Sequence, residues 1–191
     1  GYKCFRIEYG KQAPPKPPAW DKRSIENSFY KITVAGNSGA VASIYDKQLQ
    51  RELVDGNSPY RFGQYVYVAG GDGDSRLINP FSSLPPATLN IEGASNGKLQ
   101  RMEHQPWGTS ILLTSSAVNT PTIETEILLF DNQKKIEFRY RLHKNYTTAK
   151  EGVYFAFPVA VANPAFAYAP QQGWLDPAHD LMKGASLEWF S

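Results

Sequence analysis

Five short segments of alternating side chains follow one another at regular spacing through the middle of the chain. In 136–142 apolar residues alternate with charged ones, which is the period of two that a β-strand with one wet face shows. Residues that favour turns separate the segments at 95–97, 106–108, 119–121 and 131–133. This pattern predicts an antiparallel meander. Its strands are expected at 88–92, 98–104, 109–116, 122–130 and 135–142.

An earlier stretch, 24–55, has the pattern of a β-hairpin. Tyr30, Ile32 and Val34 fall on one side of its first strand. The sequence Gly-Asn-Ser-Gly at 36–39 then tolerates the positive φ that a tight reversal needs. A single hairpin cannot bury its own apolar face. We therefore predict an all-β antiparallel fold in which a second sheet covers this hairpin.

The composition agrees with many short strands joined by turns. Aromatic residues make up 13% of the chain, and it contains 14 Pro and 15 Gly. The formal charge of only +2 gives no electrostatic footprint for nucleic acid or a membrane surface. No apolar run approaches the ~20 residues of a membrane-spanning helix. Cys4 is the only cysteine, so no internal disulfide is expected, which favours a reducing, cytoplasmic compartment.

Proline divides the chain into three expected parts. Residues 1–10 are predicted to be a strand at the junction with a preceding domain. Residues 11–22 form a Pro-rich connector, for which extended polyproline II is favoured. Residues 23–191 are predicted to form the β-domain.

Three blocks of residues resemble the carboxy-terminal β-domain of glycoside hydrolase family 38, the class II α-mannosidases. The first block comprises Ile25-Glu26-Asn27, Phe29-Tyr30, Gly39, Ser43-Ile44-Tyr45-Asp46-Lys47 and Arg51-Glu52-Leu53-Val54. The second comprises Leu142, Lys144, Tyr146, Lys150-Glu151, Tyr154-Phe155 and Phe157-Pro158. The third comprises Gly173, Pro177, Asp180, Gly184-Ala185 and Trp189.

The resemblance implies a galactose mutarotase-like supersandwich, present here as a partial domain. Family domains continue with further strands, so we expect this β-domain to be truncated at its carboxy-terminal end. An apolar edge would then be exposed. Aggregation or an edge-mediated dimer is the expected consequence.

The same resemblance implies that the catalytic groups lie in another domain. Family members are retaining α-mannosidases with two carboxylates and a zinc ion, and these groups sit outside the β-domain. We therefore expect no catalytic residue, metal ligand or cofactor in this chain, with zinc in the catalytic domain of the parent. The expected partners are that catalytic domain and a mannose-containing carbohydrate. In agreement, His104, His143 and His179 are isolated in the sequence, whereas zinc needs clustered ligands.

Three aromatic residues are candidates for carbohydrate contact. Tyr65, in a strand predicted at 60–68, lines up best with a family tyrosine near the bound mannose; the alternative is an ordinary sheet aromatic. Trp107 and Trp174 lie in loops, where tryptophan either forms a sugar platform or plugs the end of a sandwich.

The sequence is also compatible with two other functions. A free-standing carbohydrate-binding module would use the exposed loop aromatics. A mutarotase or lyase on the same fold would need His104 or His143 to converge with Glu103 or Glu137.

Several polar pairs have simpler interpretations. The Asp-x-Asp at 72–74 is expected to be a solvated turn and not a calcium loop. Asp46 and Lys47 are expected to form a polar corner, and Lys150-Glu151 to orient a strand edge. His179-Asp180 is expected to be loop surface.

Overall fold

The computed structural model describes residues 23–70 and 89–167, together with Cys4, Arg6, Ala169, 173–176, His179 and Asp180. The predicted connector at 11–22 and the Asp-x-Asp at 72–74 lie outside the described residues, as does the strand predicted at 1–10 apart from Cys4 and Arg6.

The described part of the chain folds into strands and turns, and contains no helix able to span a membrane. The first strands are β1 (Ser24–Glu26), β2 (Tyr30–Ala35), β3 (Ala40–Asp46), β4 (Arg51–Glu52), β5 (Gln64–Gly70) and β6 (Leu89–Gly93). The remaining strands are β7 (Ser95–Gln105), β8 (Gly108–Ala117), β9 (Thr120–Phe130), β10 (Ile136–His143) and β11 (Glu151–Ala156). The prediction of an all-β antiparallel sandwich is confirmed.

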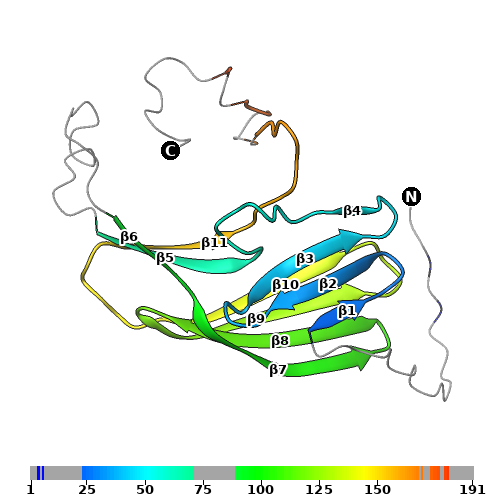
Figure 1. Cartoon of the computed structure of the whole chain (residues 1–191), viewed down its shortest axis with the longest axis horizontal. Coiled ribbons are helices and arrows are strands. Elements are labelled where there is room, and N and C mark those ends of the chain that lie inside the picture. The colour runs from blue at the N-terminus through cyan, green and yellow to red at the C-terminus, as the bar shows by residue number, and fades with distance from the viewer. Residues whose placement is uncertain are drawn as a thin grey trace.

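These strands form three antiparallel sheets (Figure 1). Their strand orders are β1-β2-β3-β4, β10-β9-β8-β7 and β11-β5-β6. The β7–β10 sheet has the longest strands. The β1–β4 sheet lies over one end of it and the β5, β6 and β11 sheet over the other, as Figure 1 shows.

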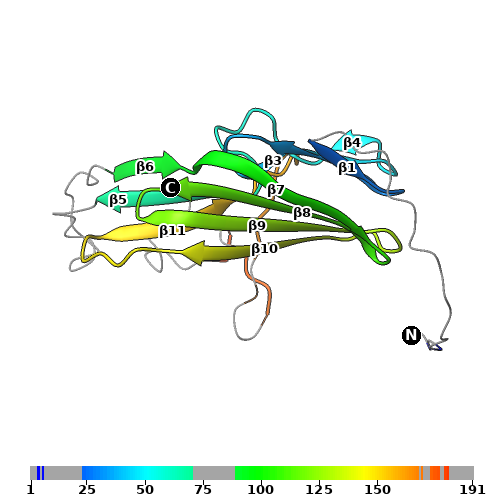
Figure 2. The same cartoon turned by 90° about the horizontal axis from the view of Figure 1, so that it is seen from below.

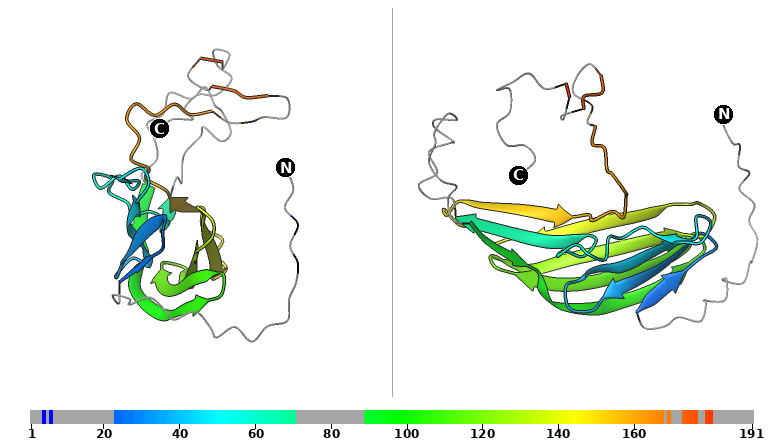
Figure 3. Two further views of the ribbon diagram at one scale, coloured as in Figure 1. Left: turned by 90° about the vertical axis from the view of Figure 1, so that its right-hand side faces the viewer. Right: turned by 45° about the horizontal axis from the view of Figure 1, so that its top comes forward.

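The main core lies between the β1–β4 sheet and the β7–β10 sheet. In the left view of Figure 3 the blue strands of the first sheet lie opposite the green and yellow strands of the second. Alternation puts Ile32 of β2 and Ile127 of β9 into this layer, and both are fully buried. The predicted inward side of the hairpin is therefore correct. The buried residues of the main core also include Ile25, Val34, Val41, Ile44, Val54, Ile111, Leu113 and Leu129.

A second, smaller core lies under the three-stranded sheet. Tyr65 and Tyr67 of β5 pack with Ala94 and with Ile123 of β9. The long strand β9 thus contributes to both cores, because Ile123 and Ile127 lie four residues apart on the same face.

The predicted meander is confirmed for β7 to β10, but the turn predicted at 95–97 is wrong. The chain does not reverse there: β6 pairs with β5, and β7 begins at Ser95 and pairs with β8. The residues Asn96 and Gly97 fall where the β7–β8 register shifts. A Cβ on Gly97 would lie 2.5 Å from the carbonyl oxygen of Gly36. Glycine is therefore needed for the close approach of β7 to the β2–β3 turn.

The turn predicted at 106–108 does join two strands, β7 and β8, and it depends on glycine. Gly108 has a φ of 151°, and a Cβ added to it would lie 2.1 Å from the backbone oxygen of Leu129. A side chain at this position would strain its own backbone and displace β9.

We predict that Gly108→Ala lowers the free energy of unfolding by about 2–4 kcal/mol, because both a backbone conformation and a backbone contact are lost. The matched control is Gly56→Ala, since a Cβ at Gly56 meets nothing within 4 Å. That variant should stay within about 0.5 kcal/mol of the wild type. Urea unfolding of both variants measures this, and equal effects would contradict the prediction.

Candidate functional site

The polar residues of the first family-like block hold the two large sheets together. The side-chain oxygen of Asn27 accepts hydrogen bonds from the backbone nitrogens of Phe29 and Tyr30, at 2.8 and 2.7 Å. Its amide nitrogen donates to the carbonyl oxygen of Phe130 at 2.7 Å, which links β1 to the end of β9. The Lys47 ammonium donates to the Asn27 carbonyl oxygen at 2.6 Å.

The Asp46 carboxylate makes a second link at the same end. It was expected at a polar corner, but the side chain is buried. One oxygen accepts from the backbone nitrogens of Gln48 and Leu49, each at 2.9 Å, and the other lies 2.8 Å from the Lys134 ammonium. The hydrogen bond from Lys134 is the largest of the influences that hold the pKa of Asp46 below its usual value.

Glu52 also accepts hydrogen bonds from backbone nitrogens. One carboxylate oxygen accepts from the backbone nitrogens of Ile44, Leu53 and Val54 at 2.8–3.0 Å. The other accepts from the Ser43 hydroxyl at 2.5 Å. Desolvation is the largest single influence and raises the pKa of Glu52, but these hydrogen bonds together lower it below its usual value.

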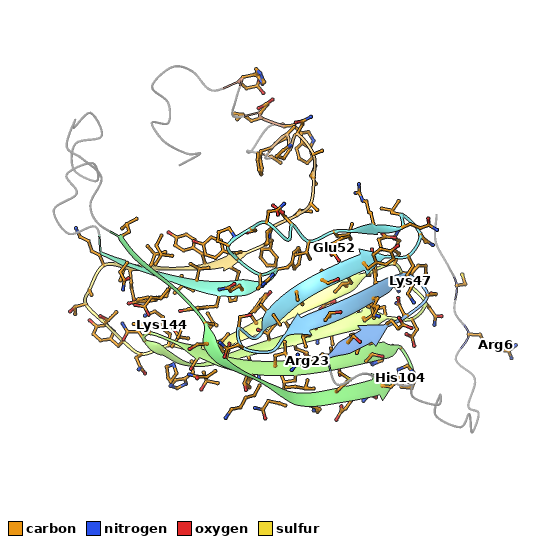
Figure 4. The ribbon with its side chains drawn as sticks, in the orientation of Figure 1. Arg6, Arg23, Lys47, Glu52, His104 and Lys144 are labelled. Carbon is orange, nitrogen blue, oxygen red and sulfur yellow. The ribbon has the colours of Figure 1, made fainter. Side chains whose placement is uncertain are left out.

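Another charged pair lies at the opposite end of the sandwich, as the position of Lys144 relative to Lys47 and His104 in Figure 4 shows. The Lys144 ammonium donates to Glu151. Lys144, and next the Tyr67 hydroxyl, hold the pKa of Glu151 below its usual value. Glu151 therefore pairs with Lys144, which lies seven residues earlier, and this contact fixes the loop between β10 and β11.

The three carbohydrate-contact candidates lie in different surroundings. Tyr65 is only 1% exposed; its hydroxyl lies 2.6 Å from the Thr120 hydroxyl, and its ring meets Phe155 edge-on. This burial favours a core role, because stacking on a sugar needs an open ring face. Trp107 is 40% exposed and packs on Phe130 at the β7–β8 turn, whereas Trp174 is 79% exposed.

His104 and Glu137, two of the residues of a mutarotase-like reading, have other partners. The His104 ring nitrogens lie 3.0 Å from the Thr109 hydroxyl and 3.7 Å from the Asp131 carboxylate. Glu137 accepts from Lys135 and Arg139, at 2.9 and 2.8 Å. Among the described residues, no group of three or more His, Cys, Asp or Glu side chains is placed to hold a metal ion.

His179 forms an exposed pair, with Asp176 and not with Asp180. Its Nδ1 lies 2.8 Å from the Asp176 carboxylate, which raises the pKa of His179 above its usual value. The Asp180 carboxylate instead accepts from the backbone nitrogen of Asp176 at 2.7 Å. Asp176 therefore contacts both His179 and Asp180.

The sequence pattern did not predict two exposed surfaces, each on the outer face of a sheet. The outer face of the three-stranded sheet carries Leu89, Ile91 and Tyr154, each more than half exposed and placed on one face by the strand register. The outer face of the β7–β10 sheet carries a hollow of about 340 Å³. Its lining comprises Arg101, Leu112, Glu124, Glu126, Arg139, Tyr140 and Arg141. The alternation in 136–142 indicated a wet face, but sequence alone could not assemble residues from four strands.

Comparison with known families identifies the domain. The family model described as the glycosyl hydrolases family 38 C-terminal domain matches residues 25–180. The chain therefore belongs to this family, as its three blocks indicated, and it is a domain of a glycoside hydrolase. A search of curated proteins found no match.

Two of the buried tyrosine hydroxyls, those of Tyr65 and Tyr140, allow a direct comparison. The Tyr65 hydroxyl is bonded to Thr120, whereas the Tyr140 hydroxyl has no hydrogen-bond partner among the described residues. We predict that Tyr65→Phe lowers the free energy of unfolding by about 1–2 kcal/mol, since it strands the Thr120 hydroxyl. Tyr140→Phe should be neutral or stabilising, because it removes a buried group that gains no bond. Chemical unfolding of both variants measures this; a larger loss in Tyr140→Phe would contradict it.

The buried Asp46 predicts a dependence on pH. Its folded pKa lies below the value of about 3.9 for an unfolded Asp, so its contribution to stability is complete above that value and is lost as pH falls through the folded pKa. Asp46→Asn should therefore be less stable than the wild type at about pH 6, and this difference should narrow on acidification to about pH 2–3. Urea midpoints at several pH values measure it.

Lys134→Met provides the matching control, because Lys134 is the first cause of the lowered pKa of Asp46. It should shift the acid-induced loss of stability to higher pH. A constant difference between the wild type and Asp46→Asn over the whole range would contradict the assignment.

Proposed function

We propose that this chain is a non-catalytic β-domain of an α-mannosidase-like glycoside hydrolase. In this role it packs on the catalytic domain and completes one wall of the carbohydrate cleft. The observation that carries the proposal is that three family-like acidic residues bind groups of the domain itself. Asp46, Glu52 and Glu151 are all engaged by the domain's own backbone or lysines. Hydrolysis of a glycoside instead needs two carboxylates facing the scissile bond.

The zinc ion of the family is expected outside this domain. Zinc is held by clustered His, Cys or acidic side chains. The described residues do not fit such a site. His104 contacts Thr109 and Asp131, and the exposed His179 contacts the carboxylate of Asp176. We propose that the catalytic domain supplies the zinc ligands and the hydrolytic carboxylates.

The outer face of the three-stranded sheet is the surface proposed for packing. Leu89 and Ile91 of β6 and Tyr154 of β11 expose apolar area on this face, on either side of β5. A contiguous apolar patch on a domain is typical of a protein interface. Interfaces between domains of one chain have this character, so the catalytic domain is the proposed occupant.

The exposed tryptophans support a second reading, in which the chain binds carbohydrate by itself. Trp174 is the most exposed of the three carbohydrate-contact candidates. An open indole face can stack on the apolar side of a pyranose. In this reading the chain binds sugar but makes no contact with a catalytic domain.

Activity assays test the proposal. We predict that this chain alone does not hydrolyse an aryl α-mannoside, with or without added zinc, and that hydrolysis appears only when it is joined to a family 38 catalytic domain. Release of the aryl alcohol measures turnover. Hydrolysis by the chain alone would overturn the proposal.

A charge on the packing face tests the proposed contact. Ile91→Glu should weaken association with the catalytic domain, because it buries an unpaired carboxylate in the interface. The matched control is Leu49→Glu, which places the same charge on another exposed leucine, in the β3–β4 turn. Equal association of both variants would contradict the assignment of the face.

A further inference from the structure

The outer face of the β7–β10 sheet carries an ordered row of charged side chains around an apolar centre. The register aligns Arg101 of β7, Leu112 of β8, Glu126 of β9 and Arg139 of β10 across the sheet. Arg141 and Glu124 form the next cross-strand pair. Figure 2 shows these four strands side by side. The row therefore runs perpendicular to the strands, over the middle of the sheet.

The charged groups of this row hold one another in place. The Glu126 carboxylate lies 4.0 Å from the Arg101 guanidinium and 3.6 Å from that of Arg139. Arg139 also donates to Glu137 at 2.8 Å, and Arg141 donates to Glu124 at 2.8 Å. Guanidinium and carboxylate groups therefore already lie close to one another across the row.

The same side chains surround a hollow of about 340 Å³. Such a volume is within the range of small-molecule sites, which begins near 300 Å³. Leu112 is the aliphatic residue of the lining, and the guanidinium and carboxylate groups surround it. The hollow thus combines an apolar contact with hydrogen-bond donors and acceptors.

The balance of charge indicates the class of ligand. The lining contains three arginines and two glutamates, so neither sign dominates and a highly charged polyanion is disfavoured. Each guanidinium offers five N–H donors, and each carboxylate accepts through two oxygens, so donors and acceptors alternate across the hollow. A neutral ligand that carries adjacent hydroxyl groups and an apolar ring face matches this array. Oligosaccharides have that chemistry.

We propose that this hollow is a glycan-binding subsite. A pyranose ring rests with its C–H face on Leu112, while Arg101 and Arg139 donate to its hydroxyls and Glu126 and Glu124 accept from them. The choice of sugar rests on the proposed function, but binding on this face can be measured whether or not the chain contributes to hydrolysis. The subsite binds the sugar without a chemical step.

Titration by NMR tests the subsite directly. The backbone amides of the chain are followed while α-linked mannotriose is added up to about 10 mM, which detects millimolar affinity. Maltotriose serves as a second neutral trisaccharide. We expect saturable shifts in β7–β10 around Leu112 with at least one of these sugars. Shifts confined to the Trp107 and Trp174 loops, or no shifts with either sugar, would overturn the proposal.

Matched variants separate the subsite from general surface charge. Arg139→Ala should weaken sugar binding by about tenfold, as expected for the loss of hydrogen bonds from a charged donor. Arg139→Lys should also weaken it, because the planar fork is lost although the charge remains. The control is Arg51→Ala, which removes an exposed arginine of β4 outside the hollow. Equal binding by Arg139→Ala and Arg51→Ala would overturn the assignment.

Discussion

The packing of the short β1–β4 sheet on the long β7–β10 sheet is the contact on which the rest of the structure depends. Its centre is an apolar layer that includes Ile32 and Ile127. Apolar burial has no preferred direction, so this layer alone leaves the relative position of the sheets loosely defined. The hydrogen bond from Asn27 to Phe130 and the ion pair of Asp46 with Lys134 add direction at one end. Together they fix the short sheet over the turn between β9 and β10.

The family-like polar residues of the first block are used by the fold itself. Asn27, Asp46 and Glu52 are residue types that also occur in catalytic sites. In the fold each of them accepts backbone hydrogen bonds that the strands cannot make for themselves. These polar side chains therefore stabilise the sandwich at the ends of its strands.

Most strands could be predicted from the sequence because their pattern is local. Alternation over six or seven residues defines which side chains share a face, as in 136–142, and it does not depend on distant contacts. The sheet partners of β6 could not be predicted in this way. Asn96 and Gly97 look like a turn, but the glycine is required by contact with Gly36, sixty-one positions earlier in the numbering. A local pattern carries no information about that neighbour.

The candidate sites show the same difference between local patterns and distant contacts. The sequence by itself determined the β class, the inward face of the hairpin and the three blocks that place the chain among family 38 C-terminal domains. Only the tertiary structure decided that Tyr65 faces Thr120, that Glu151 pairs with Lys144, and that Arg101, Glu126 and Arg139 meet on one surface. The physical reason is that periodicity acts between residues a few positions apart, whereas a site is assembled by hydrogen-bond register between strands that the sequence keeps far apart.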